Sequence, residues 1–416
     1  MRIAFWGNFG ALNLGNECTL AAAVYNFRVR LPQAELLAIC REPADVVVRH
    51  GIGAIPMSQP REPYEGLRRP NPLRMLVSLG REVGAWVRAF LEAGDIDALL
   101  VTGSGILSDE GEGTLGLPYE LFKWSLVTKL RRKKLFFVSV GAESLTRRAS
   151  QGLVKGALRL ADYRSYRDSH SVRILQGVGF RTEHDVVRPD LAFSLPRPPA
   201  GAAGLARAAW DGTRQRRVAV GLFNYRGRGV ANAADAAAYQ AYLDRICSLI
   251  LWLLGRGDAV RVVLGDFAYD EKVRLDVRAE LARRGLDLTN PAFIDTPAES
   301  FEQLVEQLGS VDFVIASRYH NVVLGLLLAK PVVSLSYEPK HNALMRDMGL
   351  GEYCQPLDDF TLDRLAEQLL RLEANATALS AVIAERTATN RARLAEQYDL
   401  IVRTVCGSSA ERRREH

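Results

Sequence analysis

An arginine and a histidine stand two positions apart where a strongly apolar run ends. The run Phe313–Ala316 predicts a buried strand, Arg318 and His320 follow it, and Val322–Leu326 predicts an apolar helix. Side chains two positions apart in an extended segment share one face, so both groups could reach one ligand. A guanidinium pairs with a carboxylate or phosphate, and an imidazole exchanges a proton near neutral pH. The alternative is structural, with Arg318 paired to an acid of its own domain and His320 capping the helix.

Two further segments place basic groups after predicted strands. Arg167 follows the short strand Tyr163–Ser165, and the adjoining Asp168 or Ser169 suits the N-cap of the next helix. Capping accounts for the two cap residues and leaves Arg167 free for another partner. The segment Ser336–His341 adds another base and imidazole after a later strand, and by itself it is typical of a surface loop.

The first predicted strand runs straight into a glycine-containing turn, Gly7–Glu17, which precedes a helix. Glycines there let backbone N–H groups face an anion at the positive end of the helix. The turn matches neither GxGxxG nor the GK[ST] phosphate loop, so it carries no nucleotide fingerprint. It is either a tight turn without a ligand or a contact for an anion or sugar.

Two more predicted strands end in turns of small residues. Ala98–Thr102 leads into the turn Gly103–Gly105 and then to Asp109, and Leu135–Val140 leads into Gly141. Small residues let a ligand approach the backbone closely, and Asp109 or the acid after it could accept a hydrogen bond from a hydroxyl. The alternative is a pair of ordinary strand-to-loop turns with solvated acids.

Short apolar runs alternate with longer segments of helical period, which is typical of βαβ units around a buried parallel sheet. The proline-rich segment Pro196–Gly201 interrupts this alternation. We therefore expect an α/β protein of two Rossmann-like domains facing a central cleft, because open α/β sheets bind ligands beyond their strand ends. The predicted parts are an N-terminal domain 1–195, a linker 196–216, a C-terminal domain 217–375, and a C-terminal helix with a basic tail, 376–416.

The elements expected along the chain follow the same alternation. The predicted strands are Arg2–Trp6, Glu35–Ala38, Ala98–Thr102, Leu135–Val140, Tyr163–Ser165, a short one before Pro189, Arg217–Leu222, Val260–Leu264, Phe293–Ile294, Phe313–Ala316 and Pro331–Ser336. The predicted helices are Glu17–Arg30, Leu73–Ala93, Tyr119–Leu130, Leu153–Leu160, Ser169–Gln176, Ala234–Leu254, Glu271–Arg284, Ser300–Leu308, Asn321–Leu328 and a helical stretch Phe360–Val405.

The composition fits a folded protein with sizeable cores. The chain has 416 residues, 48% of them hydrophobic and 25% charged, which excludes a disordered, collagen-like or coiled-coil chain. No apolar stretch reaches the roughly 20 residues that span a bilayer, and Met1 is not followed by an export signal. We therefore expect a cytoplasmic protein whose five scattered cysteines are reduced thiols.

The net charge of +6 favours anionic partners. The basic runs Arg131–Lys134 and Arg412–Arg414 lack interleaved aromatic residues, so we expect no nucleic-acid binding. A weak attraction to anionic lipid at the inner membrane stays open. Because no zinc-ligand spacing and no GxSxG elbow occurs, we expect no metal site and expect His50 and His184 to face solvent.

Taken in order, these motifs resemble the polysaccharide pyruvyl transferase family, from Gly7 to about Leu350. The Arg-Asp pair and the Arg-x-His segment are the specific ones. Asn16 departs from an Asp in the family pattern and Ser104 interrupts a glycine triplet, which concerns the acceptor side more than the donor side. The matching motifs are Asn13-Leu14-Gly15-Asn16-Glu17, Gly103-Ser104-Gly105, Arg167-Asp168-Ser169, Pro189-Asp190-Leu191-Ala192, Ser317-Arg318-Tyr319-His320 and Tyr337-Glu338-Pro339-Lys340.

The resemblance implies a glycosyltransferase-B-like pair of domains that transfers pyruvate from phosphoenolpyruvate to sugar hydroxyls as a ketal. The acceptor would be a cell-envelope or extracellular polysaccharide or its lipid-linked precursor, held by the N-terminal domain, with the donor on the C-terminal domain. Arg318 and His320, joined by Arg167, are the implied catalytic residues, and phosphoenolpyruvate is a co-substrate with no other cofactor. The candidate substrate-binding residues are Gly7, Asn13, Gly15, Asn16, Glu17, Gly103, Ser104, Gly105, Asp109, Gly141, Asp168, Ser317, Tyr319, Tyr337 and Lys340.

Two other functions stay open at this point, because a fold does not decide a function. A nucleotide-sugar-dependent glycosyltransferase of the same architecture would use Arg318 and Lys340 on a diphosphate. A non-catalytic, sugar-binding member of an envelope-assembly complex would need none of the basic cluster.

Overall fold

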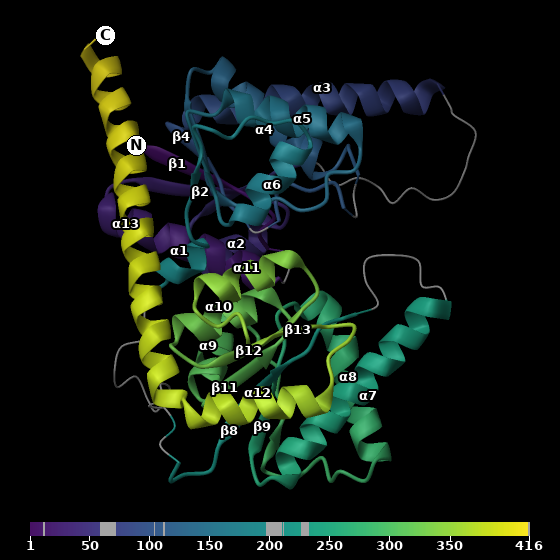
Figure 1. Cartoon of the computed structure of the whole chain (residues 1–416). Helices are drawn as coiled ribbons and strands as arrows, with labels where there is room; N and C mark the ends of the chain where they lie inside the picture. Colours follow the sequence, from purple (N-terminus) through teal and green to yellow (C-terminus); the bar gives the residue numbers. More distant parts are fainter. Residues whose placement is uncertain are drawn as a thin grey trace. The chain divides into compact units, whose positions relative to one another are not determined.

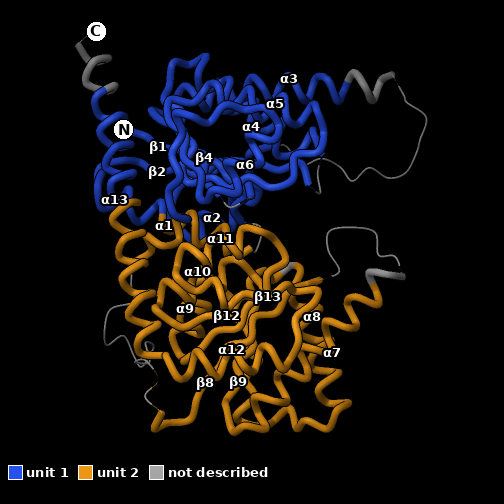
Figure 2. Tube along the Cα trace, in the orientation of Figure 1, with its two compact units in different colours: residues 1–11, 23–190, 395–416 blue, residues 12–22, 191–394 orange. Residues whose placement is uncertain are grey.

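The chain divides into two compact units (Figure 2), residues 1–11, 23–190 and 395–416, and residues 12–22 and 191–394. The computed structural model describes residues 1–10, 13–58, 72–103, 105–110, 113–196, 210, 212–225 and 233–414. The division after Asp190 differs from the predicted boundary at 195. Helices α1 (Leu14–Arg30) and α13 (Ala376–Arg414) each contribute residues to both units. Of the predicted linker 196–216, residues 197–209 and 211 lie outside the described residues.

The first unit contains a seven-stranded parallel sheet with the strand order β3-β2-β1-β4-β5-β6-β7. The order runs outward in both directions from the central pair β1 and β4, which is the doubly wound arrangement of Rossmann-like domains. The strands are β1 (Arg2–Trp6), β2 (Glu35–Cys40), β3 (Gly53–Pro56), β4 (Ala98–Val101), β5 (Lys134–Val140), β6 (Tyr163–Tyr166) and β7 (Val186–Val187).

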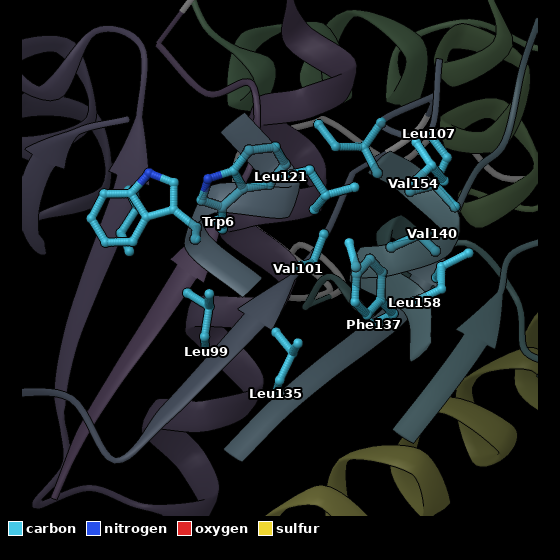
Figure 3. Packing of buried hydrophobic residues seen from close by; sticks show 14 of the residues in the cluster. Trp6, Leu99, Val101, Leu107, Leu121, Leu135, Phe137, Val140, Val154 and Leu158 are labelled. Atoms are coloured by element: carbon cyan, nitrogen blue, oxygen red, sulfur yellow. The ribbon is translucent and has the colours of Figure 1, made fainter. Parts of the chain in front are cut away.

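Helices of the first unit cover this sheet and close its core (Figure 1). The strands are apolar on both faces, as expected for a parallel sheet covered by helices. Figure 3 shows Leu99, Val101 and Phe137 packing with Leu121 and Val154 in one buried cluster. The helices, besides α1 and α13, are α2 (Pro43–His50), α3 (Pro72–Asp95), α4 (Leu117–Leu130), α5 (Arg148–Leu160) and α6 (Ser169–Gly177).

The second unit repeats the arrangement with a six-stranded parallel sheet in the order β10-β9-β8-β11-β12-β13. Its order reverses at the pair β8 and β11, so this pair is the topological switch point of the second sheet. The strands are β8 (Arg217–Gly221), β9 (Ala259–Val263), β10 (Phe293–Ile294), β11 (Phe313–Ala316), β12 (Val332–Ser336) and β13 (Cys354–Pro356).

One helix of the second unit, α10, is buried along its whole length. From Val322 onward its sequence is apolar all round, which is typical of a helix enclosed by other elements rather than lying at the surface. It begins immediately after β11 and crosses over to β12. The helical elements of the unit are a short 3-10 helix η1 (Leu191–Ser194) and α7 (Ala233–Gly255), α8 (Phe267–Arg283), α9 (Phe301–Gly309), α10 (Tyr319–Leu327), α11 (Pro339–Asp347) and α12 (Leu362–Ala374).

The predicted fold class is confirmed: the protein has two α/β units, each with a doubly wound parallel sheet. The expected central cleft between the two domains stays a prediction. The predicted helical stretch Phe360–Val405 is two helices, α12 and α13. Helix α13 ends at Arg414, so it includes the basic run Arg412–Arg414 that was predicted to lie in the basic tail.

Candidate active site

Arg318 stands at the carboxyl end of β11, at the switch point of the second sheet. β11 ends at Ala316, which pairs with Gly221 of β8, and Arg318 is the N-cap residue of α10. Ligands of open α/β sheets bind at this position. The prediction that Arg318 and His320 share an extended segment is wrong, because the crossover helix begins at Tyr319 and His320 lies in its first turn.

A buried carboxylate of α8 holds Arg318. Nε and Nη2 of Arg318 donate to Asp270 Oδ2 and Oδ1 at 2.8 and 2.6 Å, and Asp270 also accepts from the backbone N–H groups of Asn224 and Asp266. Burial disfavours the charge on Arg318, but the Asp270 carboxylate outweighs burial and raises the pKa of Arg318. The alternative in which Arg318 pairs with an acid of its own domain is therefore confirmed for Nε and Nη2. Nη1 takes no part in the pairing with Asp270.

Two aromatic rings form a wall beside Arg318. The rings of Phe223 and Tyr337 stack with their centroids 4.2 Å apart, and the guanidinium carbon of Arg318 lies 4.6 Å from the Phe223 centroid. The face of an aromatic ring attracts a cation, so this wall helps to orient the guanidinium. Tyr337 was predicted as a site residue, whereas Phe223 was not. Phe223 lies at the end of the apolar run that contains β8, and this position could have identified it as a candidate.

The turn before α1 borders both Arg318 and His320. His320 is 8% exposed, and a Cβ built on Gly15 would lie 2.6 Å from its Cγ. The backbone N–H of Leu14 donates to the carbonyl oxygen of Gly265 at 3.2 Å. A Cβ on Gly265 would in turn lie 2.9 Å from the Cβ of Arg318. These contacts bring the predicted turn and the predicted Arg-x-His segment together within the second unit.

Asp266 adds a buried acid that the sequence analysis missed. It precedes α8 as its N-cap residue, and Nδ2 of Asn13 donates to its Oδ2 at 2.9 Å. Burial raises the pKa of Asp266; Arg318 opposes this shift and Asp270 adds to it. The sequence Gly265-Asp266 directly after a buried strand could have identified Asp266 as a candidate. The other candidate turns of the sequence analysis likewise place small and polar residues after a predicted strand.

Two buried polar side chains next to Arg318 have no hydrogen-bond partner among the residues that the structure describes. They are Ser317, at Oγ, and Asn321, at both amide atoms. A Cβ on Gly221 or Gly265 would lie 3.1 or 3.0 Å from the Asn321 amide, so this amide lies between the ends of β8 and β9. Buried polar groups are nearly always satisfied, so these two side chains at the switch point are candidates for contact with a ligand.

The segment after β12, predicted as a surface loop, is the buried start of α11. Pro339 at the first helical turn favours this helix, which buries Lys340 and His341. The two ring nitrogens of His341 lie 3.0 Å from the carbonyl oxygen of Ser317 and 3.2 Å from that of Glu338. Lys340 Nζ pairs with Glu338 at 2.7 Å. His341 therefore fixes the backbone that leads into α10, and the charge of Lys340 is matched locally.

An open hollow of about 610 Å³ lies at the carboxyl ends of β12 and β13. Tyr337, Glu338 and the exposed Arg346 line it, so it adjoins the aromatic wall. The second unit thus offers space for a ligand on the Tyr337 side of that wall.

In the first unit, four predicted glycines gather at the carboxyl edge of the sheet. Gly7 follows β1, Gly103 and Gly105 follow β4, and Gly141 follows β5. The N–H of Gly141 donates to Gly103 O at 3.2 Å, and a Cβ on Gly7 would lie 2.7 Å from Thr102 O. Close approach of the chain to itself explains these small residues without a ligand.

Arg167 is fully buried among three carboxylates. Its Nε lies 3.0 Å from Asp168 Oδ2, its Nη2 lies 3.8 Å from Glu143 Oε1, and its Nη1 lies 3.9 Å from Asp190 Oδ2. Capping by Asp168 does not account for Arg167, as predicted, and acids that follow neighbouring strands share its charge. A Cβ on Gly141 would lie 2.7 Å from Arg167 Cζ, so this glycine makes room for the guanidinium.

Two predicted acids of the first unit have structural partners. Asp168 is the N-cap of α6 and accepts from the backbone N–H of Ser171 at 2.7 Å. Asp109 accepts from the backbone N–H groups of Thr146 and Arg147 at 3.1 and 2.8 Å. Burial opposes ionisation of Asp109, but these hydrogen bonds outweigh it and lower its pKa. A contact of either acid with a substrate hydroxyl stays a prediction.

The remaining candidates divide between the units. Asn16 and Glu17 are buried in the first turn of α1, in the second unit with Tyr319. Ser104 lies outside the described residues. Arg167 belongs to the first unit and Arg318 to the second, and their joint action on one donor stays a prediction.

Several other expectations concern single residues. His184 is exposed as predicted, but His50 is buried, because it ends α2, whose inner side packs on β2 and β3. All five cysteines are free thiols. Within the described ranges, no group of three or more metal-ligating side chains occurs and no helix is long and apolar enough to cross a membrane.

The reversed strand order in both units and the polar groups at the strand ends define a two-domain, Rossmann-like protein of the glycosyltransferase-B type. Three of the solved structures with a similar fold are two epimerases and a glycosyltransferase. UDP-GlcNAc 2-epimerase from Neisseria meningitidis, bound to UDP-GlcNAc, is 11% identical with a TM-score of 0.57, covering 98% of this chain and 100% of that one. A glycosyltransferase from Rickettsia africae ESF-5 is 9% identical with a TM-score of 0.57, covering 97% and 98%. UDP-GlcNAc 2-epimerase from Methanocaldococcus jannaschii is 9% identical with a TM-score of 0.53, covering 89% and 92%.

At these identities the likeness establishes the fold alone, and the sequence decides the family. The model of the polysaccharide pyruvyl transferase family matches residues 13–339, from the turn before α1 to the start of α11. This chain belongs to the polysaccharide pyruvyl transferase family and is therefore an enzyme. No curated protein sequence matches it.

Proposed function

We propose that this enzyme transfers pyruvate from phosphoenolpyruvate to two hydroxyls of a sugar as a ketal. The acceptor is a cell-envelope or extracellular polysaccharide or its lipid-linked precursor. The observation that carries the proposal is the arrangement of Arg318 and His320 around the Gly15 and Gly265 turns at the switch point of the second sheet. Phosphoenolpyruvate is a cytosolic metabolite, so a cytoplasmic location is part of the proposal.

The donor carries a carboxylate and a phosphate, and both need cationic hydrogen-bond donors. Asp270 engages Nε and Nη2 of Arg318, which leaves Nη1 on the side of the guanidinium away from that pair. Lys340 Nζ has three donors, and its carboxylate partner Glu338 is only partly buried. We propose that Arg318 Nη1 and Lys340 bind the donor anion, and that Asp270 keeps the guanidinium in position.

His320 is the proposed proton carrier. C3 of the donor takes a proton from the imidazolium, C2 becomes oxocarbenium-like, and the first acceptor hydroxyl forms a C2–O bond and returns its proton to His320. The C2–O bond to phosphate then breaks with its electrons on phosphate. The second hydroxyl closes the ketal and its proton leaves with phosphate. Atoms and charge balance without a redox step, and Arg318 stabilises the charge that moves onto phosphate.

The proposal separates donor binding from turnover at two neighbouring residues. Replacing Arg318 by Ala should weaken phosphoenolpyruvate binding by the about 1.5–3 kcal/mol of a charge-assisted contact. Arg318→Ala also leaves the buried carboxylate of Asp270 without its cationic partner. Arg318→Lys is therefore measured as a second variant that keeps the positive charge. Replacing His320 by Ala should lower turnover by about 100-fold or more while phosphoenolpyruvate still binds.

The measurements are calorimetric titration with phosphoenolpyruvate and phosphate release with a sugar acceptor. His184→Ala is the matched control, because this histidine is exposed and distant in sequence from the site. Near-full turnover of the His320 variant would remove its assigned role. Turnover with a nucleotide sugar and none with phosphoenolpyruvate would instead support the glycosyltransferase alternative.

A further inference from the structure

Helix α3 exposes an apolar face as well as burying one. Ala89 and Ala93 of α3 are buried in the core of the first unit, and Trp86 Nε1 donates to Tyr119 of the neighbouring helix α4 at 2.7 Å. A helix that covers a sheet normally turns polar residues outward. In α3 the outward residues are apolar. The exposed fractions are 61% for Leu79, 57% for Val83, 53% for Val87, 36% for Phe90 and 61% for Leu91.

These five residues form one continuous stripe, here called the α3 stripe. Leu79, Val83, Val87 and Leu91 follow each other at intervals of four, and such positions are neighbours on one face of a helix. Phe90, three positions after Val87, adjoins the same face. Gly80 and Gly84 interleave the stripe, and a Cβ on either would meet nothing within 4 Å, so the surface there is open. Figure 1 shows α3 as a long helix beside α4 at the outside of the first unit.

Arginines border the α3 stripe on both sides. Arg81 and Arg88 are exposed and lie along one edge of it, given the roughly 100° turn per residue of a helix. On the other edge, the guanidinium of Arg131 from the end of α4 lies 4.8 Å from the centroid of the Phe90 ring. A Cβ on Gly94 would lie 2.7 Å from Arg131 Cζ, so this glycine lets the arginine cross the helix.

The acids of the described part of α3 do not cancel this rim. Glu82 faces α4, where it accepts from the hydroxyl of Tyr119 at 2.6 Å. Glu92 is half-buried and lies one turn after Arg88, and Asp95 is the exposed last residue of the helix. Neither acid forms an ion pair with Arg81 or Arg88 among the described residues. An apolar stripe with a cationic rim therefore remains on the outer face.

We propose that the α3 stripe docks on the surface of an anionic lipid bilayer. An apolar face between basic borders is the pattern of helices that lie in the plane of a membrane interface, where apolar side chains enter the acyl boundary and arginines meet headgroups. Basic side chains close to an anionic surface are attracted to its headgroups. A second copy of this chain fits the stripe less well, because pairing two stripes would bring arginine rims of like charge together.

The test is co-sedimentation of the full chain with vesicles of phosphatidylcholine alone and of phosphatidylcholine with phosphatidylglycerol. The protein should bind the anionic vesicles, with an affinity that falls as salt rises. Val87→Gln with Leu91→Gln should weaken this binding at least about tenfold, because it removes two exposed apolar side chains. Arg81→Gln with Arg88→Gln should weaken binding to the anionic vesicles and flatten the salt dependence.

The matched control replaces two exposed leucines of other helices, Leu275 of α8 and Leu370 of α12, by Gln. They are 51% and 54% exposed, so the loss of apolar surface is similar, and vesicle binding should not change. Turnover with a soluble acceptor should be the same in all these variants. Equal sedimentation of the stripe variant and the control, or no binding of the unaltered chain, would overturn the proposal. A dimer in light scattering that the stripe variant abolishes would assign the stripe to a second copy instead.

Discussion

Gly15, at the start of α1, packs directly against the imidazole of His320. A Cβ at position 15 would lie 2.6 Å from His320 Cγ, which is closer than side-chain atoms approach one another. The carbonyl of the same turn residue, Gly15, accepts from the hydroxyl of Thr19 at 3.0 Å, so the turn is held in place from the helix side. A segment from the beginning of the chain is therefore a wall of the site that β11 and α10 build.

Gly15→Ala should displace His320 and lower turnover roughly 100-fold, because a shift of about 1 Å in a catalytic group has effects of this size. The affinity for phosphoenolpyruvate should change much less, since the three atoms nearest to that Cβ all belong to His320. Phosphate release and calorimetric titration measure the two effects. Gly152→Ala is the control: a Cβ there meets nothing within 4 Å, and the change should stabilise α5 by about 0.5–1 kcal/mol. Equal turnover of the two variants would show that the Gly15 contact does not position His320.

Asp270→Asn should lower the free energy of unfolding by about 3–5 kcal/mol, because it strips a buried guanidinium of its ionic partner. The Asp270 variant should also regain more stability from saturating phosphoenolpyruvate than the unaltered protein does, since the donor anion then offsets the charge of Arg318. Denaturant melts with and without phosphoenolpyruvate measure both effects. Glu367→Gln, at an exposed ion pair with Arg371, should cost at most about 1 kcal/mol. A donor effect no larger than in the unaltered protein would count against Arg318 as the donor-binding cation.

Asp109→Asn distinguishes a structural acid from a sugar-binding one. The pKa of Asp109 is lowered from its usual 3.8, so its carboxylate stabilises the folded state above that pH, and this contribution is lost as pH falls through the lowered value. The variant should be less stable by about 1–3 kcal/mol at neutral pH. The difference in the free energy of unfolding between the variant and the unaltered protein should become smaller below pH 3.8. A raised KM for the acceptor with unchanged stability would make Asp109 a substrate ligand.

Arg167→Lys tests whether the arginine of the first unit touches the donor. Its three carboxylate neighbours indicate a positioning role, because the donor would compete with Asp168, Glu143 and Asp190 for the same cation. The lysine variant should retain the thermal shift caused by phosphoenolpyruvate and lose stability. If the variant folds with unchanged stability but no longer responds to phosphoenolpyruvate, Arg167 binds the donor as the family resemblance implies.

The sequence predicted the central strands well but only two of the four edge strands. Buried parallel strands such as Ala98–Val101 and Phe313–Ala316 are continuous apolar runs, and their boundaries agree with the structure to within a residue. Of the edge strands, β7 and β10 were predicted, β10 with the bounds that the structure has. The edge strands β3 (Gly53–Pro56) and β13 (Cys354–Pro356) were missed, because neither short segment is a continuous apolar run.

At the site, the sequence identified the groups but not their partners. Arg318 and His320 were selected because charged and titratable groups follow a buried strand. Their neighbours Asp270 and Gly15 lie 48 and 305 positions away, and no local pattern signals contacts over such distances. The pairing of Arg318 with Asp270 also changes how Arg318 would bind a ligand. Two of its nitrogens are occupied by a carboxylate before any ligand binds.

Product analysis with phosphoenolpyruvate decides whether this enzyme transfers pyruvate from that donor. The enzyme would be incubated with phosphoenolpyruvate and, separately, with nucleotide sugars, each with candidate acceptors and a chelator. Phosphate release and the acceptor mass would be followed together. Phosphate should appear only with phosphoenolpyruvate, in step with an acid-labile mass gain of one pyruvate less one water, and His320→Ala should slow both by about 100-fold or more. Glycosylated acceptor from a nucleotide sugar, with no phosphate released from phosphoenolpyruvate, would contradict the account.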